Sequence, residues 1–425
     1  MSETEESAEL ADYRARARAW LEANMEPRGP AAASRFSFAV DDDFSPERLA
    51  EQQALQRKVY DAGYAGISWP AEYGGQGLPK AYERAFAQEA AHFVMPDLGI
   101  AGGTTMGVCG LTILAHGSPE LLRTHIPRVL SGEELIVQLF SDPEAGSDLA
   151  GVRTQAVRDG DRWVLNGSKI WTSGAYYANY GMCLARTDWD VPKHRGLTWF
   201  MVPLDAPGVT VRRIKQINGN AEFCQEFFDD VELTDADIIG ELNDGWTVAQ
   251  TMLMFERGGG DAAATDPPDA RDVAPDLREL AESVGRLDDP QARRLITTAH
   301  VDDVVRHHLS RRIAGLMRGG SHRAVALASY GKLASGLYDP VRADLALEIA
   351  DGGASTWQHA DSPGARAATD LLNCRFLSIA GGTVEMQRNS IGERVLGLPR
   401  EPSFDSERPF REVVREALTW SGKVG

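Results

Sequence analysis

The sequence lacks the features by which several large protein classes are recognised. It has only four cysteines in 425 residues, far apart and without a CxxC or Cys/His pattern, which argues against a disulfide framework and a zinc site. No apolar run approaches the roughly 20 residues that a membrane span needs. The chain begins MSETEESAEL, acidic where a signal peptide would be basic and then apolar. We therefore expect a cytoplasmic protein whose cysteines are small core residues in a reducing compartment.

Positive charge is also scarce, with 44 Lys and Arg against 62 Asp and Glu and a formal net charge of −18. Such an acidic chain is not expected to bind nucleic acid or an anionic membrane surface, although a local basic pocket can still hold an anionic ligand. The motifs GxGxxG after a strand, GxxxxGK[ST], HExxH and GxSxG are missing too, which disfavours a dinucleotide-binding Rossmann unit, a P-loop, a zinc protease and an α/β-hydrolase. His307-His308 fits a solvated helix surface better than a metal site, so we expect no metal ion.

Hydrophobic and turn patterns divide the chain into three parts, and its length suffices for two or three packed domains. Residues 1–132 have a helical pattern, and Ser45-Pro46 is typical of a helix start. Residues 133–241 contain short alternating segments, two of them around the Asp159-Gly160 turn, as strands do. Residues 242–425 are again helical, after a Gly-, Ala-, Asp- and Pro-rich loop at 258–275. We predict an α+β protein with an N-terminal helical domain, a central β domain and a C-terminal helical domain. Helices are expected at 10–24, 45–61, 80–93, 98–116, 118–130, 364–380 and 384–396, with further segments within 277–350.

One carboxylate lies at the end of a predicted helix. At helical spacing Glu256 shares an apolar face with Leu253, Ala249 and Trp246. Burial on such a face disfavours the charged form of a carboxylate and raises its pKa, which suits a general base. The alternative is a solvated side chain at a frayed helix end, because Gly258-Gly-Gly260 is a plausible helix stop and the helix dipole disfavours a negative charge there. The position alone does not decide between the two.

Three other segments have a functional and a structural interpretation each. The small residues of the loop 142–148 can let its backbone approach a cofactor, or form an ordinary turn. Trp171, beside Thr172 and Ser173, suits either one wall of a flavin site or a position in the core. The two glycines before Thr383 precede a predicted helix, whose N-terminus favours an anionic or carbonyl oxygen. Thr383 can equally be no more than the cap of that helix.

Four segments, in this order and spacing, resemble the acyl-CoA dehydrogenases over nearly the whole chain. They are GISWPAEYGG at 66–75, FSDPEAGSD at 140–148, NGSKIWTSG at 166–174, and AGGTVEMQRN at 380–389 running on to ERVLGLPRE at 393–401. Each alone is weak to moderate, and their combination is highly specific. The resemblance implies a helical domain, a β-barrel domain and a helical bundle, in agreement with the three parts above.

The resemblance also implies noncovalently bound FAD and an acyl-CoA thioester. The isoalloxazine ring would contact Phe140, Ser141, Trp171 and Ser173, and Gln138 would border both the flavin and the acyl pocket. The FAD pyrophosphate and the CoA arm would lie near Gly146 and Ser147. The adenosine half of FAD would lie near Thr383 and Glu385. On the substrate side, Ser147 and Arg257 would lie near the CoA, Arg257 alternatively near the base.

The identity of the base depends on which branch of the family the chain resembles. Many members carry the base in a Tyr-Glu-Gly-Thr segment, where this chain has Gly381, which cannot act as a base. The isovaleryl and long-chain branch places a Glu followed by Arg on the first helix after the β domain, as in Glu256-Arg257. The resemblance therefore implies that Glu256 removes the α-proton while the β-hydrogen leaves as hydride to flavin N5, giving the trans-2-enoyl-CoA. The backbone N–H near Gly381 would bind the thioester carbonyl, an oxyanion-type contact worth ~3–4 kcal/mol where measured.

Acceptor and assembly follow from the resemblance alone. Electron-transferring flavoprotein is the expected acceptor, and a homodimer, a homotetramer or a heteromer the expected assembly. An Arg-x-x-Phe-Gly segment, which in many members reaches the FAD of a neighbouring subunit, is not visible between 258 and 299. Two alternatives stay open: an oxidase or monooxygenase of the same superfamily, and a non-catalytic structural subunit of a heteromer. Straight, branched and polycyclic acyl groups all remain compatible with the sequence.

Overall fold

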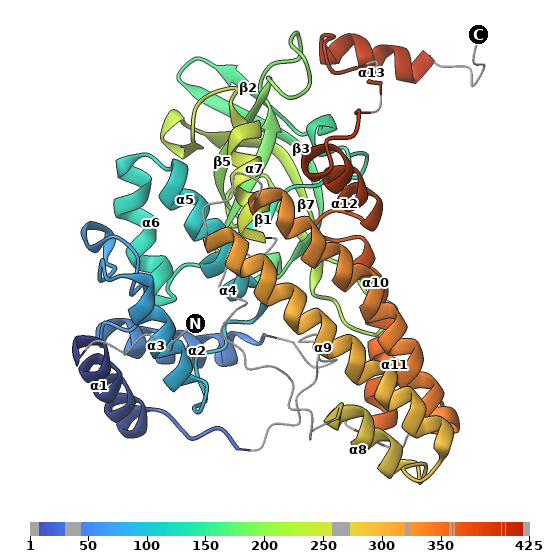
Figure 1. The fold of residues 1–425 in the computed structure, drawn as a ribbon. Coiled ribbons are helices and arrows are strands. Elements are labelled where there is room, and N and C mark those ends of the chain that lie inside the picture. The colour runs from blue at the N-terminus through green and yellow to red at the C-terminus, as the bar shows by residue number, and fades with distance from the viewer. Residues whose placement is uncertain are drawn as a thin grey trace.

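The computed structural model describes residues 8–29, 44–256, 273–318, 324–356, 359, 362–400, 402–403 and 405–419. The chain runs from a group of helices through a β-sheet to a second group of helices, as the sequence predicted (Figure 1). Most of the predicted loop at 258–275 and all of Arg257 lie outside the described residues.

Two of the N-terminal helices begin at a serine cap, and the sequence predicted the one at Ser45. The Ser45 hydroxyl accepts a hydrogen bond from Arg48 N at 3.3 Å, and Ser118 accepts one from Leu121 N at 3.2 Å. The predicted helix at 98–116 is interrupted in its middle by a turn of π-helix, η2, which includes Cys109. The elements are α1 (Ala8–Asn24), α2 (Pro46–Asp61), η1 (Ala71–Tyr73), α3 (Lys80–Ala90), α4 (Gly99–Thr104), η2 (Thr105–Cys109), α5 (Gly110–His116) and α6 (Pro119–Ser131).

One sheet of eight strands forms the middle of the molecule, with the order β6-β7-β3-β2-β4-β5-β8 and β1 paired in parallel with β4. The predicted hairpin is β2 and β3, in antiparallel register about Asp159-Gly160. Strand β4 was not predicted, because YGMCLAR shows no alternation of apolar and polar residues. The strands are β1 (Ile136–Leu139), β2 (Gln155–Asp159), β3 (Arg162–Ser173), β4 (Tyr180–Arg186), β5 (Leu197–Pro203), β6 (Val209–Arg213), β7 (Phe223–Leu233) and β8 (Ile238–Ile239).

The C-terminal helices begin with α7, which packs on α5, η2 and β5. The two longest, α9 and α10, pack against each other along the bundle. The last helix, α13, was not predicted. The elements are α7 (Gly245–Glu256), α8 (Pro275–Ser283), α9 (Pro290–Arg318), α10 (Ala324–Ala350), η6 (Asp351–Ala354), α11 (Pro363–Asn373), η7 (Cys374–Ser378), α12 (Val384–Ser390), η8 (Ile391–Val395) and α13 (Phe410–Thr419).

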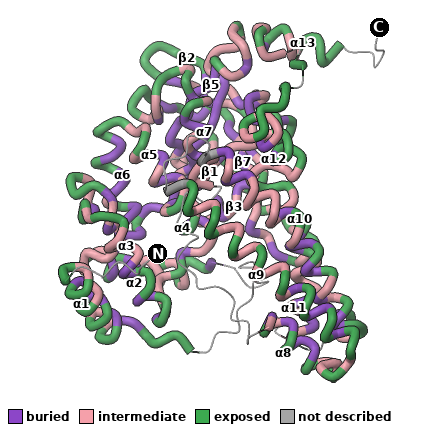
Figure 2. The backbone as a smooth tube through the Cα atoms, in the orientation of Figure 1, coloured by how far each residue is buried: buried purple, intermediate pink, exposed green. Residues whose placement is uncertain are grey.

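Buried residues form three clusters, seen as purple segments along the tube in Figure 2. The first joins α1, α2, α3, α5, α6, one face of the sheet and α7. The second fills the other face of the sheet and includes Ala101 of α4. The third lies between α8, α9, α10 and α11. Neighbouring residues of β5 divide between the clusters, Trp199 and Met201 in the first and Phe200 and Val202 in the second. All four cysteines are free and buried, as predicted.

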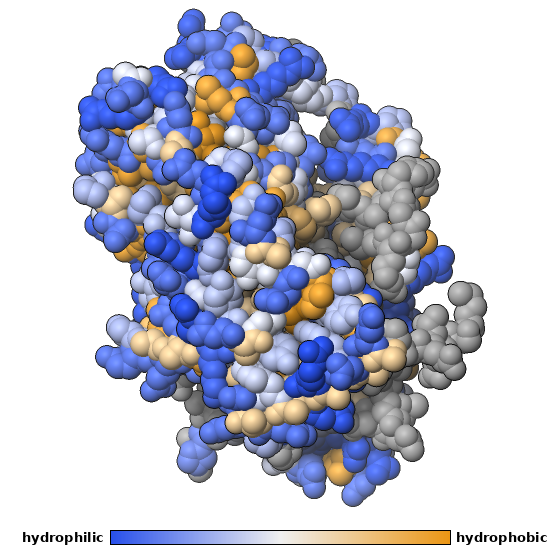
Figure 3. Space-filling view, turned by 90° about the vertical axis from the view of Figure 1, so that its left-hand side faces the viewer, coloured by the Kyte–Doolittle hydropathy of each residue, from blue (hydrophilic) through white to orange (hydrophobic). Residues whose placement is uncertain are grey.

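The outer face beside the N-terminal helices is mainly hydrophilic, with small scattered apolar patches (Figure 3). None of the described helices combines the length and the apolar character that crossing a membrane requires.

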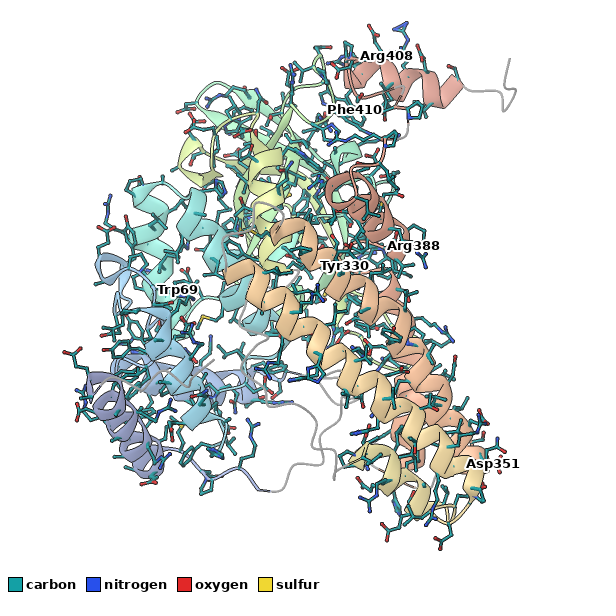
Figure 4. The ribbon with its side chains drawn as sticks, viewed as in Figure 1. Trp69, Tyr330, Asp351, Arg388, Arg408 and Phe410 are labelled. Atoms are coloured by element: carbon teal, nitrogen blue, oxygen red, sulfur yellow. The ribbon has the colours of Figure 1, made fainter. Side chains whose placement is uncertain are left out.

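The C-terminal segment crosses back to the β domain. Phe410 is 4% exposed, stacks on Trp189 at 5.6 Å between ring centroids, and has the guanidinium of buried Arg186 4.2 Å from its ring (Figure 4). Arg411 pairs with Asp190 at 2.8 Å. This end of the chain is therefore fastened to the strand β4 and the loop that follows it.

Candidate active site

A buried ion pair joins the loop after β1 to strand β3. Lys169 is fully buried, and its ammonium donates hydrogen bonds to Asp142 Oδ1 at 2.7 Å and to the Phe140 carbonyl at 2.8 Å. The Asp142 carboxylate also accepts hydrogen bonds from Thr154 N at 2.7 Å and Thr154 Oγ1 at 2.9 Å. Ile170 N donates to the Ser141 carbonyl at 2.9 Å. These contacts fix the predicted ring-binding residues Phe140 and Ser141 to the strand that carries Trp171 and Ser173.

Trp171 occupies a β-bulge that turns its side chain out of the sheet. The pairing of β3 with β7 shifts register between Ile170 and Thr172, and Trp171 has φ of 70°, which is uncommon for a non-glycine residue. The indole is 57% exposed and meets the edge of the Phe223 ring, with 6.0 Å between the ring centroids. A large aromatic ring presented in this way is available to cover a planar ligand.

The end of β1 supplies an unsatisfied acceptor beside this tryptophan-bearing strand. The buried Gln138 Oε1 has no hydrogen-bond partner among the described residues, and a buried amide oxygen normally has one. Phe140, two residues later, packs edge-on against Trp199 at 5.1 Å. The orphaned oxygen and the exposed indole together fit the flavin ring that the sequence implied.

The loop that holds Gly146 and Ser147 is exposed, and a side chain at Gly146 would meet nothing within 4 Å. Its last residue, Asp148, accepts from Lys193 Nζ at 2.9 and 3.0 Å, and the same ammonium pairs with Asp405 at 2.6 Å. The two acidic partners raise the pKa of Lys193 despite the opposing effect of burial. Open space over small residues suits a pyrophosphate, and the loop is held to the C-terminal segment.

Glu256 is the last residue of α7, and its helix is buried on the side that the sequence predicted. Ala249 and Met252 are fully buried, and Trp246 and Leu253 pack on the first core cluster, as does Phe140. The helix end therefore lies against the same core as the ring-binding loop. Glu256 itself is half-buried, so it is not the fully solvated helix end of the alternative interpretation.

Gly381 meets Glu256 in space although the two are far apart in sequence. The position that a Cβ on Gly381 would take is 3.4 Å from Glu256 Oε1 and 3.3 Å from Lys332 Cε. Gly381 has φ of +65°, which favours glycine. A carboxylate oxygen carried on α7 thus reaches the space beside the main chain at Gly381.

The glycine turn is held from its carbonyl side. Gln387 Nε2 donates to the carbonyls of Gly381 and Gly382, both at 3.1 Å, while no backbone–backbone hydrogen bond among the described residues uses the Gly381 N–H. Thr383 caps α12 by accepting from Met386 N at 3.2 Å, which is the structural role that the sequence allowed for it. Glu385 is exposed on the first turn of α12. Contacts of Thr383 and Glu385 with FAD remain predictions.

Three features of this site had no counterpart in the sequence interpretation. The Lys169–Asp142 pair joins residues 27 apart, although both belong to motifs that drew attention for other reasons. Lys332 and Gln387 were not singled out, because their importance depends on contacts with a distant turn. Arg257, a predicted substrate contact, lies outside the described residues.

Sequence and fold both match proteins of a known class. The family models for the acyl-CoA dehydrogenase N-terminal domain and middle domain match residues 7–133 and 138–231. The chain is 37% identical over 402 residues to acyl-CoA dehydrogenase IpdE1 of Mycobacterium tuberculosis, covering 92% of this chain and 99% of the relative. It is 38% identical over 356 residues to acyl-CoA dehydrogenase FadE34 of the same organism, covering 82% of this chain and 47% of the relative. The chain thus spans about half the length of that larger protein.

Among solved structures, the "Tcur3481-Tcur3483 steroid ACAD" is similar at a TM-score of 0.73 and 27% identity, covering 94% of this chain and 100% of that one.

Proposed function

Because this chain belongs to the acyl-CoA dehydrogenase family, we propose that it oxidises an acyl-CoA thioester to the trans-2-enoyl-CoA with Glu256 as the α-proton base. The observation that carries the proposal is the 3.4 Å between Glu256 Oε1 and the position of a Cβ on Gly381. In many family members the base projects from that position of the Tyr-Glu-Gly-Thr segment. Here α7 delivers a carboxylate oxygen to the same place.

The reaction divides between two neighbouring carbons of the substrate. Glu256 accepts the α-proton, and the Gly381 N–H donates to the thioester carbonyl and stabilises the negative charge that develops on its oxygen. The β-hydrogen leaves with its electron pair, so that a carbon–carbon double bond forms. Members of this family use FAD, which when bound supplies the two-electron acceptor for that hydrogen.

The residues that would hold FAD are those of the bulge and the two loops described above. Gln138, Phe140, Ser141, Trp171 and Ser173 would contact the ring, with the orphaned Gln138 oxygen and the outward indole as support. Gly146 and Ser147 would hold the pyrophosphate, and Thr383 and Glu385 the adenosine half. In this arrangement the chain's own residues orient the substrate and cover the ring.

The similarity to a steroid acyl-CoA dehydrogenase favours a polycyclic acyl group over a short straight one. The name of that structure couples two proteins, which supports an assembly of this chain with a related one as much as a homodimer or a homotetramer. Electron-transferring flavoprotein remains the expected acceptor. The carboxylate of Glu256 supports a chain that has kept its base, within a homomer or a heteromer.

The first test replaces the base. Glu256→Gln should keep FAD content and acyl-CoA binding while slowing anaerobic flavin reduction by roughly 10²–10⁴-fold, because general bases contribute about that much. Glu22→Gln, on the exposed side of α1, is the matched control and should reduce at the unmodified rate. Near-normal reduction by Glu256→Gln would remove Glu256 from the mechanism.

A panel of acyl-CoAs, added anaerobically to the purified protein, identifies the substrate class by which acyl group bleaches the flavin spectrum. Rapid reoxidation of the bleached flavin by air would favour the oxidase alternative. A chain that binds FAD only with a second protein present would favour the heteromer.

A further inference from the structure

Lys332 brings a positive charge to the place where Glu256 and Gly381 meet. Lys332 lies in the first third of α10, two residues after Tyr330, which is labelled in Figure 4. Lys332 Cε and Cδ lie 3.3 and 3.9 Å from the position of a Cβ on Gly381, and Glu256 Oε1 lies 3.4 Å from that same position. The aliphatic stem and the carboxylate oxygen thus border the same small space.

The face of α10 that carries Lys332 also supports the turn around Gly381. The Lys332 ammonium donates to the Leu377 carbonyl. One turn further along α10, the Gly336 carbonyl accepts from Ser378 Oγ at 2.8 Å, and a Cβ on Gly336 would come within 2.6 Å of a Val384 methyl. The segment 377–384 therefore lies directly on α10, with Lys332 between that helix and the base.

Two other ionisable groups lie on the described elements that pack against α7, and burial favours the neutral form of each. Cys109, from η2, is fully buried, and burial raises the pKa of its thiol far above the ordinary range. His116, from α5, contacts Thr251 Oγ1 at 2.8 Å, and burial lowers the pKa of its imidazole. Strand β5, which also packs on α7, has no ionisable side chain. Of these described groups, Lys332 is the one that brings a charge to Glu256.

We propose that Lys332 is a positioning residue for the base: its ammonium holds the Glu256 carboxylate in the ionised form and ties the Gly381 turn to α10. This inference rests on the proposed role of Glu256. A carboxylate must be ionised to accept the α-proton, and a nearby cation favours that form. With Lys332 in place, the enzyme keeps a competent base at lower pH than the carboxylate alone would allow.

Replacing Lys332 by Met separates the charge from the packing. The Met side chain has a similar length and keeps the packing against Gly381, but it carries no ammonium group. We expect the pH at which flavin reduction is half-maximal to rise by about one unit, within the usual range for loss of a neighbouring opposite charge. Reduction at about pH 6 should then fall roughly tenfold, and at about pH 9 it should approach the unmodified rate.

The assay is anaerobic stopped-flow reduction of the FAD-loaded protein, with the acyl-CoA that bleaches the flavin fastest in the panel. FAD content and binding of the enoyl-CoA product, followed by the change in flavin absorbance, verify that the site is intact. Lys332→Arg should restore most of the original pH profile because it restores the charge. Lys80→Met, which removes an exposed ammonium on α3, is the control and should leave the profile unchanged.

Three outcomes overturn the inference. A loss of rate in Lys332→Met that is equal at every pH would show that Lys332 only supports the turn. If Lys332→Met leaves the pH profile unshifted while Glu256→Gln is inactive, the role of Lys332 is refuted and the proposed function stands. A Glu256→Gln protein that still reduces its flavin would instead overturn the proposed function, and this inference with it.

Discussion

Glu226 is a carboxyl group sealed inside the β domain, on the inner side of the strands that present Trp171. Its side chain is fully buried, its Oε2 accepts from Thr172 Oγ1 at 2.8 Å, and its Oε1 has no partner among the described residues. Lys169, its neighbour across the sheet, already donates to Asp142 and to a carbonyl. Burial raises the pKa of Glu226 from 4.5 to about 8, so the group is mostly protonated in the folded protein at neutral pH.

This shift makes Glu226 destabilising as the pH rises. Below pH 4.5 the group is protonated in both states and has no effect on the pH dependence of unfolding. Between pH 4.5 and about 8 the folded protein keeps a proton that the unfolded chain releases, so the free energy of unfolding falls with pH. The slope reaches about 1.4 kcal/mol per pH unit for one proton, which amounts to a few kcal/mol over the window.

Glu226→Gln preserves the shape and the acceptor for Thr172 but cannot ionise. The stability of this variant relative to the unmodified protein should therefore increase steadily from about pH 5 to about pH 8. Urea midpoints of both proteins, measured at saturating FAD across that range, give the difference directly. Parallel curves would show that Glu226 has an ordinary pKa in the folded state and would refute the reasoning.

Two further substitutions test the flavin side of the site. Lys169→Met should lower the free energy of unfolding by roughly 3 kcal/mol and weaken FAD binding, because it leaves the buried Asp142 carboxylate without its counter-charge while three other hydrogen bonds to it remain. Thermal unfolding measures the stability, and the flavin content of the purified protein measures FAD binding. A change no larger than that of Lys80→Met would contradict the prediction. Trp171→Ala should cost little stability, since the indole is 57% exposed, but should weaken FAD retention or shift the flavin spectrum; an unchanged spectrum and flavin content would count against the ring contact.

The predictable parts of the structure are those that local chemistry determines. Ser45 followed by Pro46 started a helix as expected, and the Asp159-Gly160 turn placed β2 against β3 in the expected register. Strand β4 escaped detection because nearly all its residues are buried, so it has neither the alternation of a half-exposed strand nor a nearby turn of the hairpin type. The π-helical turn η2 could not be predicted, because its apolar residues have the same spacing as those of an ordinary α-helix.

The candidate site was predictable only as a set of separate segments. Glu256 could be placed on an apolar helix face, and Gly381 on a turn before a helix, each with a structural alternative. That the two share one space depends on how α7, α10 and the turn after η7 pack together, which no local pattern encodes. Lys332 illustrates the limit, since nothing in its own stretch of α10 marks it and its interest lies entirely in what it contacts.

The fastening of the C-terminal segment has a consequence during synthesis on the ribosome. Arg411 pairs with Asp190 across 221 residues of chain, so at about 5–20 residues per second the loop after β4 is synthesised some 10–45 s before its partner segment exists. During that interval the guanidinium of Arg186 and the ring of Trp189 lack the aromatic cover of Phe410. Until translation has nearly finished, the nascent β domain therefore exposes the surface that Phe410 later covers. A chaperone could bind this surface during that interval.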